Sequence, residues 1–135
     1  MTGMKIGELA RRAHCQVETI RYYEREKLLP EPNRSVGNFR LYGPAHHERL
    51  AFIRRCRSLG MPLVEIRALL EFRDSPHGNC GAVNELLDAH IRRVMDRIGE
   101  MRALEKQLKK LRRLCPRERP AESCEILKSL ARTAE

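Results

Sequence analysis

The spacing of apolar residues predicts a chain that is mostly helical and begins with two short helices. Residues 6–12 place Ile6, Leu9 and Ala10 on one face, and a brief turn leads to a second helical pattern at residues 17–29. Two short helices joined by a turn of three or four residues form the helix-turn-helix pattern, in which the second helix is the recognition helix that contacts DNA. Because any small helical protein can produce this spacing, the pattern needs support from other features.

A segment rich in turn-forming residues comes next, at residues 30–43. Prolines and glycines punctuate it, and residues 39–42 alternate like a short strand. We therefore expect a small β-ribbon, or wing, whose polar face carries Arg34 and Arg40.

Three further helices are predicted after the wing. The first two cover residues 44–59 and 62–74, each with a proline in its first turn, and residues 75–79 then break the pattern. The third extends over residues 80–115 as one long helix. Its narrow apolar seam consists of Val83, Leu87, Ile91, Val94, Ile98, Met101, Leu104, Leu108 and Leu111.

Such a helix is about 50 Å long and would expose its seam if it stood alone. We therefore expect a homodimer in which two copies bury their seams as a coiled coil, an arrangement that also suits paired DNA half-sites. A loop beginning at Pro116 and a final amphipathic turn or two at residues 124–131 complete the chain.

The net positive charge lies mostly in the N-terminal part of the chain, which favours a nucleic-acid partner. Residues 1–60 hold 12 Lys and Arg against 6 Asp and Glu, whereas residues 61–135 hold 15 against 12. A basic half of this kind indicates nucleic acid before other partners, although it could serve solubility alone. No apolar run reaches the length of a membrane span, and the first residues do not resemble a signal peptide, so we expect a cytoplasmic protein without membrane contact.

Five cysteines in a reducing cytoplasm are expected to remain thiols. Cys80 and Cys115 bracket the long helix and cannot meet within one chain, but antiparallel pairing of two copies brings Cys80 of one beside Cys115 of the other. The loop after Cys115 can fold Cys124 back to them. These three thiols lie beside loop residues rather than in the seam, which favours metal ligation over burial as small core residues.

Three thiolates are soft donors and suit Cd(II), Pb(II), Hg(II), Zn(II) or Cu(I), although Zn(II) usually takes four ligands. His77 is a candidate extra ligand, with water as the alternative. We expect Cys15 and Cys56 to be structural, because they lie inside the predicted DNA-binding half.

Residues 6–43, with the runs TIRYYE (19–24) and NFRLY (38–42), resemble the DNA-binding domain of the MerR family of metal-responsive regulators. Residues 79–91 and the spacing of the last two cysteines resemble its cadmium/lead-responsive branch (CadR/PbrR type). The resemblance implies that Cys80 of one protomer and Cys115 and Cys124 of the other bind the metal. It also implies DNA contacts from Thr19, Arg21 and Tyr22 on the second helix and from Arg34, Arg40, Tyr42 and Arg57 beyond it.

Departures from other branches of the family narrow the choice of effector. Copper(I) sensors of the family lack a cysteine at position 80, and zinc sensors carry further Cys and His in the loop, where this chain has PRERPAES. Mercury sensors also use three cysteines and differ mainly in the sequence around Cys80.

We therefore expect a mainly α protein that is not an enzyme. Its predicted parts are a winged helix-turn-helix domain with supporting helices (4–74), a hinge (75–80), an antiparallel dimerisation helix (81–114), and a metal-binding loop with a C-terminal helix (115–135). The expected function is repression without metal and activation with Cd(II) or Pb(II) at a resistance or efflux promoter, where distortion of the DNA lets RNA polymerase engage. Alternatives are a Hg(II)- or Zn(II)-responsive regulator of the same family and a regulator that senses thiol oxidation.

Overall fold

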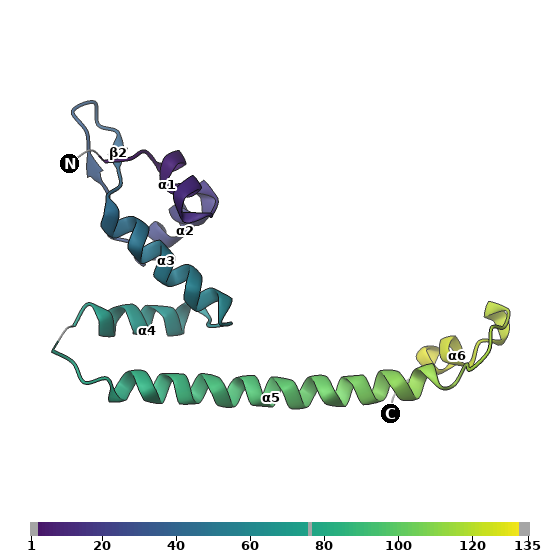
Figure 1. The fold of residues 1–135 in the computed structure, drawn as a ribbon. Coiled ribbons are helices and arrows are strands. Elements are labelled where there is room, and N and C mark those ends of the chain that lie inside the picture. The colour runs from purple at the N-terminus through teal and green to yellow at the C-terminus, as the bar shows by residue number, and fades with distance from the viewer. Residues whose placement is uncertain (1–2, 76, 133–135) are drawn as a thin grey trace. The chain divides into compact units, whose positions relative to one another are not determined.

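The computed structural model describes residues 3–75 and 77–132, which divide into one compact unit up to Leu86 and a second from Leu87 onward. The division falls within a single helix, so the first turns of that helix belong to the N-terminal unit. Figure 1 shows mainly helical elements with one small two-stranded ribbon. In order they are α1 (Ile6–Ala13), α2 (Val17–Arg25), β1 (Asn33–Arg34), β2 (Arg40–Leu41), α3 (Pro44–Ser58), α4 (Leu63–Arg73), α5 (Gly81–Arg112), the 3-10 turn η1 (Ala121–Ser123) and α6 (Glu125–Ala131).

The first two helices form the predicted helix-turn-helix. His14 ends α1 in the left-handed conformation, with φ of 55°, and the Cys15 amide donates to the Ala10 carbonyl at 3.1 Å. This hydrogen bond closes the C-terminal turn of α1 and redirects the chain into α2. Leu9, Ala10 and Ile20 are buried between the helices and the rest of the unit.

The second helix ends earlier than its apolar pattern predicts. We expected helical structure through residue 29, but α2 ends at Arg25. Lys27 adopts φ of 59°, and the Leu28 amide donates back to the Tyr23 carbonyl at 2.9 Å. Leu28 and Leu29 are buried in the core, but they enter it from the turn after α2. Their apolar side chains therefore extend the helical pattern in the sequence beyond the end of the helix.

The wing is a two-stranded antiparallel ribbon, as predicted. Arg34 pairs with Arg40 across it, and the tight turn between the strands uses a left-handed Asn38, with φ of 64°. The wing is joined to the chain's start by a bridge in which Met4 and Tyr42 exchange two backbone hydrogen bonds of 2.8 Å. Two-residue strands have little stability of their own, so the wing depends on the residues around it.

Supporting helices α3 and α4 pack against the helix-turn-helix and fix the base of the wing. The buried ring of His46 accepts from the Gly43 amide at 3.1 Å through Nδ1 and contacts the Pro30 carbonyl at 3.1 Å through Nε2. The ring therefore holds residues on both sides of the wing. Arg49 on α3 donates to Asp74 through two nitrogens, at 3.0 and 3.1 Å, and so ties α3 to the end of α4.

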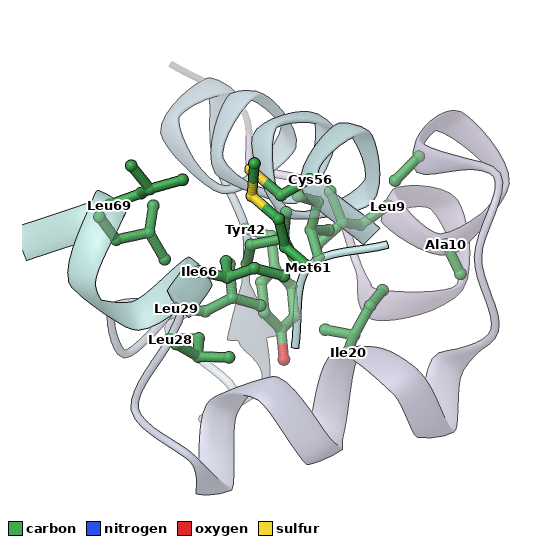
Figure 2. Close-up of a cluster of buried hydrophobic side chains, with 14 residues drawn as sticks. Leu9, Ala10, Ile20, Leu28, Leu29, Tyr42, Cys56, Met61, Ile66 and Leu69 are labelled. Carbon is green, nitrogen blue, oxygen red and sulfur yellow. The ribbon is translucent and has the colours of Figure 1, made fainter. Parts of the chain in front are cut away.

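One cluster of buried side chains forms the core of the N-terminal unit, and Tyr42 lies in it beside Ile20 and Leu29 (Figure 2). Val83 and Leu86, from the start of α5, pack against this cluster while partly buried. The core thus combines residues from the helix-turn-helix, the wing, both supporting helices and the start of α5.

Helix α5 is continuous over 32 residues and buries none of its described side chains in the single chain. The predicted seam is exposed from Leu87 to Leu108, with Ile91 at 53%, Ile98 at 45% and Leu108 at 63% of full exposure, whereas Val83 and Leu111 at its ends are partly buried. Neither this helix nor any other in the described part of the chain is long and apolar enough to cross a membrane.

Candidate DNA-binding face and thiol pair

The second helix presents polar and aromatic side chains away from the core. Arg21 and Tyr22 are exposed and Thr19 is partly so, whereas Ile20, between them in sequence, is fully buried. Arg21 donates to Glu18 one turn earlier at 3.1 Å, an exposed pair that water and salt screen. These three side chains are therefore in a position to contact a ligand along α2.

A cleft of about 710 Å³ separates α2 from the wing, and its lining is strongly basic. The structure brings together three of the predicted arginines here, Arg21 from α2 with Arg34 and Arg40 from the wing. It also adds two cations that the sequence analysis did not select, Lys5 and Arg25. A concentration of cations between a helix and a wing suits the phosphates of a duplex.

Arg57 belongs to a second, shallower depression of about 270 Å³ that also includes Thr19 and Tyr22. Its guanidinium donates to the Met61 carbonyl at 3.2 Å, which orients the side chain at the junction of α3 and α4. The predicted DNA-contacting residues therefore fall into two neighbouring groups along α2.

Tyr42 is a correction to the predicted DNA contacts. Its side chain is fully buried, and its hydroxyl donates to Glu24 on α2. Burial, followed by the hydrogen bond to Glu24, raises the pKa of Tyr42 to about 12, so the hydroxyl remains a donor. A side chain enclosed in the core cannot reach a phosphate, and the prediction of a phosphate contact here is wrong. Alternation along the chain puts Arg40 and Tyr42 on the same side, and both side chains contact Glu24 on α2.

Replacing Tyr42 with phenylalanine is expected to lower the free energy of unfolding by about 1.5–3 kcal/mol. The ring would still fill the core, but the largely buried Glu24 carboxylate would lose a charged hydrogen bond. Urea unfolding followed by circular dichroism measures the change. Tyr22→Phe, which alters an exposed hydroxyl, is the matched control, and equal stability of the two variants would contradict the assigned role of Tyr42.

Cys115 and Cys124 come together in the second unit, on either side of the loop that follows α5. The Cys115 thiol lies within hydrogen-bonding reach of the Cys124 sulfur and also donates to the Arg117 carbonyl at 3.0 Å. Cys124 immediately precedes α6, and the pKa of its thiol is lowered, chiefly by the backbone amide of Leu127. A lowered pKa favours the thiolate, which is the form that binds metals.

Cys80 immediately precedes α5, is exposed, and accepts the Asn84 amide on its carbonyl at 3.0 Å. His77, the candidate extra ligand, is also exposed, and the neighbouring residue 76 of the predicted hinge lies outside the described residues. In the described part of one chain, no three His, Cys, Asp or Glu side chains form a group that could hold a metal ion. One chain therefore brings together two of the three predicted cysteine ligands.

Cys15 and Cys56 belong to the core region of the first unit, in agreement with their predicted structural role. Cys56 is buried and Cys15 is partly buried, and burial raises the pKa of both thiols. Neither thiol has the features of a reactive or metal-binding cysteine.

A helix-turn-helix with a basic wing and an exposed second helix defines a class of DNA-binding protein. Two family models match the chain, "MerR HTH family regulatory protein" over residues 4–72 and "MerR, DNA binding" over residues 47–111. The chain belongs to the MerR family, whose members are DNA-binding transcription regulators and not enzymes.

Three similar proteins match the chain over 81% to 95% of its length. The HTH-type transcriptional regulator ZntR homolog of Haemophilus influenzae is 46% identical over 109 residues, which cover 81% of each chain. The mercuric resistance operon regulatory protein of Bacillus cereus is 35% identical over 93% of this chain and 96% of its own. The solved structure of PbrR691 from Ralstonia metallidurans CH34, in complex with lead(II), is 56% identical with a TM-score of 0.86, covering 95% of this chain and 99% of that one.

Proposed function

We propose that this regulator is a homodimeric, metal-responsive repressor–activator of a heavy-metal resistance or efflux promoter, with Cd(II) or Pb(II) as its effector. The observation that carries the proposal is the contact between the Cys115 and Cys124 thiols beside the end of α5, with Cys80 at the other end of that helix. Similarity to a lead(II)-bound regulator at 56% identity supports it.

The charge along α5 favours an antiparallel dimer. Residues 81–91 contain two acidic residues and no Lys or Arg, whereas residues 102–113 contain six Lys and Arg against one Glu. Parallel pairing would bring two basic ends together, but antiparallel pairing sets each basic end against an acidic one. The exposed seam supplies the apolar area that such pairing buries.

In this arrangement Cys80 of one protomer lies near the thiol pair of the other, and three sulfur donors form each of two symmetric sites. The donor set fits a soft ion, and the loop at residues 116–123 contains no further Cys or His to complete a four-ligand zinc site. His77 or water is proposed as an additional ligand. Similarity to a mercuric resistance regulator keeps Hg(II) as the alternative effector, and similarity to the ZntR homolog keeps Zn(II).

Promoter DNA is proposed to bind along α2 and the wing, with Thr19, Arg21 and Tyr22 on the helix, Arg34 and Arg40 on the wing, and Arg57 at the second depression. The protein would act in the cytoplasm, where its promoter and RNA polymerase are present.

Activation would distort the promoter, which costs on the order of 1–6 kcal/mol for a site of this size. A shift from 1:99 to 99:1 between inactive and active conformers needs roughly a 10⁴-fold preference of the effector for the active one.

Transcription from the promoter by purified, reduced protein tests the proposal, with separate titrations of Cd(II), Pb(II), Hg(II), Zn(II) and Cu(I). We expect Cd(II) or Pb(II) to activate at the lowest free concentration. Activation first by Hg(II) or Zn(II) would reassign the effector within the family, and silence toward all five metals would overturn the metal-sensing proposal.

The contact between Cys115 and Cys124 also allows a second candidate function, sensing of oxidation. Two thiols would form one disulfide and release two protons and two electrons to an oxidant such as a peroxide. A redox sensor would not respond to metal under reducing conditions, so the same titration separates the two functions.

A further inference from the structure

Glu24 connects the second helix to the wing at two points. Its Oε1 accepts a hydrogen bond from the Tyr42 hydroxyl, and its Oε2 accepts one from the Arg40 guanidinium at 2.9 Å. The Glu24 side chain is only 13% exposed, whereas that of Arg40 is 48% exposed. A nearly buried carboxylate thus supports an exposed cation within the basic cleft.

Tyr42 gives this carboxylate a rigid anchor. The tyrosine ring is fully buried, it forms a T-shaped pair with the His46 ring with 5.1 Å between ring centroids, and its backbone pairs with Met4. Since the hydroxyl is held by the core, it fixes one oxygen of Glu24 and thereby aims the other toward the wing. The raised pKa of Tyr42 keeps the hydroxyl protonated as the donor.

Arg40 has donors to spare for a second partner. A guanidinium carries five N–H donors in a rigid fork, and the contact with Glu24 uses one terminal nitrogen. Fixing that nitrogen sets the direction in which the rest of the fork points. Because the wing's strands are only two residues long, this contact also restrains the ribbon relative to α2.

We propose that Glu24 is a positioning residue for DNA recognition, which acts through Arg40 by setting the orientation of this guanidinium and of the wing relative to α2. The inference rests on the proposed DNA-binding face. Its consequence is that a carboxylate, which repels phosphate, contributes to preference for the operator over other duplexes.

The test compares Glu24→Gln with Glu31→Gln, which removes the same charge from the same cleft. Glutamine can still accept the Tyr42 hydroxyl but no longer offers Arg40 a charged partner. Binding of the full-length protein is measured by fluorescence anisotropy on a duplex selected from a random library by the unmodified protein, and on an unselected duplex of equal length. We expect Glu24→Gln to lower the ratio of the two affinities about tenfold and Glu31→Gln to leave it unchanged.

A double-mutant cycle separates positioning from a merely structural role. With Arg40 replaced by alanine, the further change Glu24→Gln should leave the affinity ratio unaltered, because no guanidinium remains to be oriented. Partial unfolding would lower the active fraction on both duplexes equally and would not move the ratio. An unchanged ratio in Glu24→Gln, or an equal loss with and without Arg40, would overturn the inference alone. If the unmodified protein fails to select any duplex, that result would overturn both the proposed DNA-binding face and the inference about Glu24.

Discussion

Replacing Cys124 with serine is expected to abolish activation by Cd(II) or Pb(II) while leaving promoter binding intact. Serine has a similar shape but offers a hard, protonated oxygen in place of a soft thiolate, so each site would retain two of its three sulfur donors. Loss of a ligating group should weaken metal binding by more than about 100-fold, since even outer partners of ligands contribute about 10–100-fold. Competition with a chromogenic chelator measures the affinity, and promoter transcription measures the response.

Cys15→Ser is the matched control for this prediction. It removes a thiol that is also partly exposed, but one that lies in the turn of the helix-turn-helix. Its metal affinity and transcriptional response should equal those of the unmodified protein. A Cys124→Ser variant that still responds at the same free metal concentration would show that the thiol pair is not the sensor.

Replacing Ile98 with lysine is expected to break the dimer and, with it, specific DNA binding. Ile98 lies in the middle of the exposed seam, and a homodimer contains it twice. Each copy would forfeit about 1.5–3 kcal/mol of apolar burial, and each lysine would resist removal from water. The dissociation constant of the dimer should rise more than about 100-fold. Analytical ultracentrifugation across a concentration series measures it.

Glu100→Lys is the control, because it introduces the same side chain two positions further along α5, away from the seam. That variant should remain dimeric at the concentrations at which Ile98→Lys is monomeric. A dimeric Ile98→Lys variant would mean that α5 does not pair through this seam.

The helical elements were predictable because their apolar residues recur at helical spacing and their ends carry local signals. Pro44 begins α3 and the left-handed Gly60 follows its end, as the sequence indicates. The long helix occurs as expected, over Gly81–Arg112. The end of α2 was missed, because Leu28 and Leu29 continue the apolar pattern although they enter the core from a turn. Periodicity reports burial, and it cannot distinguish a buried helix from a buried turn over so few residues.

The sequence predicted three of the arginines that lie on the basic face, but it did not predict the hydrogen bonds of Glu24 that position Arg40 there. Tyr42 was assigned to DNA through resemblance, whereas the structure buries it and turns its hydroxyl to Glu24. The signal for Glu24 was present in the spacing. It follows the fully buried Ile20 by four residues on the same helix, and a carboxylate on a core-facing side requires a partner. Which partner it finds depends on the wing, 16 and 18 residues away, and no local pattern specifies that.

The thiol pair makes the proposed sensor responsive to assembly as well as to metal. Cys115 and Cys124 are separated by eight residues of one chain, so closing the loop between them takes little chain entropy and does not need a second subunit. In the proposed site, the third sulfur comes from the partner subunit and would be available only when two chains are associated. Effector affinity should therefore depend on protein concentration near the dimer dissociation constant, and by thermodynamic reciprocity the effector should tighten the dimer by the same factor. In a cell that makes too little of this regulator, a higher metal concentration would be needed for activation, although the metal-binding cysteines are unchanged.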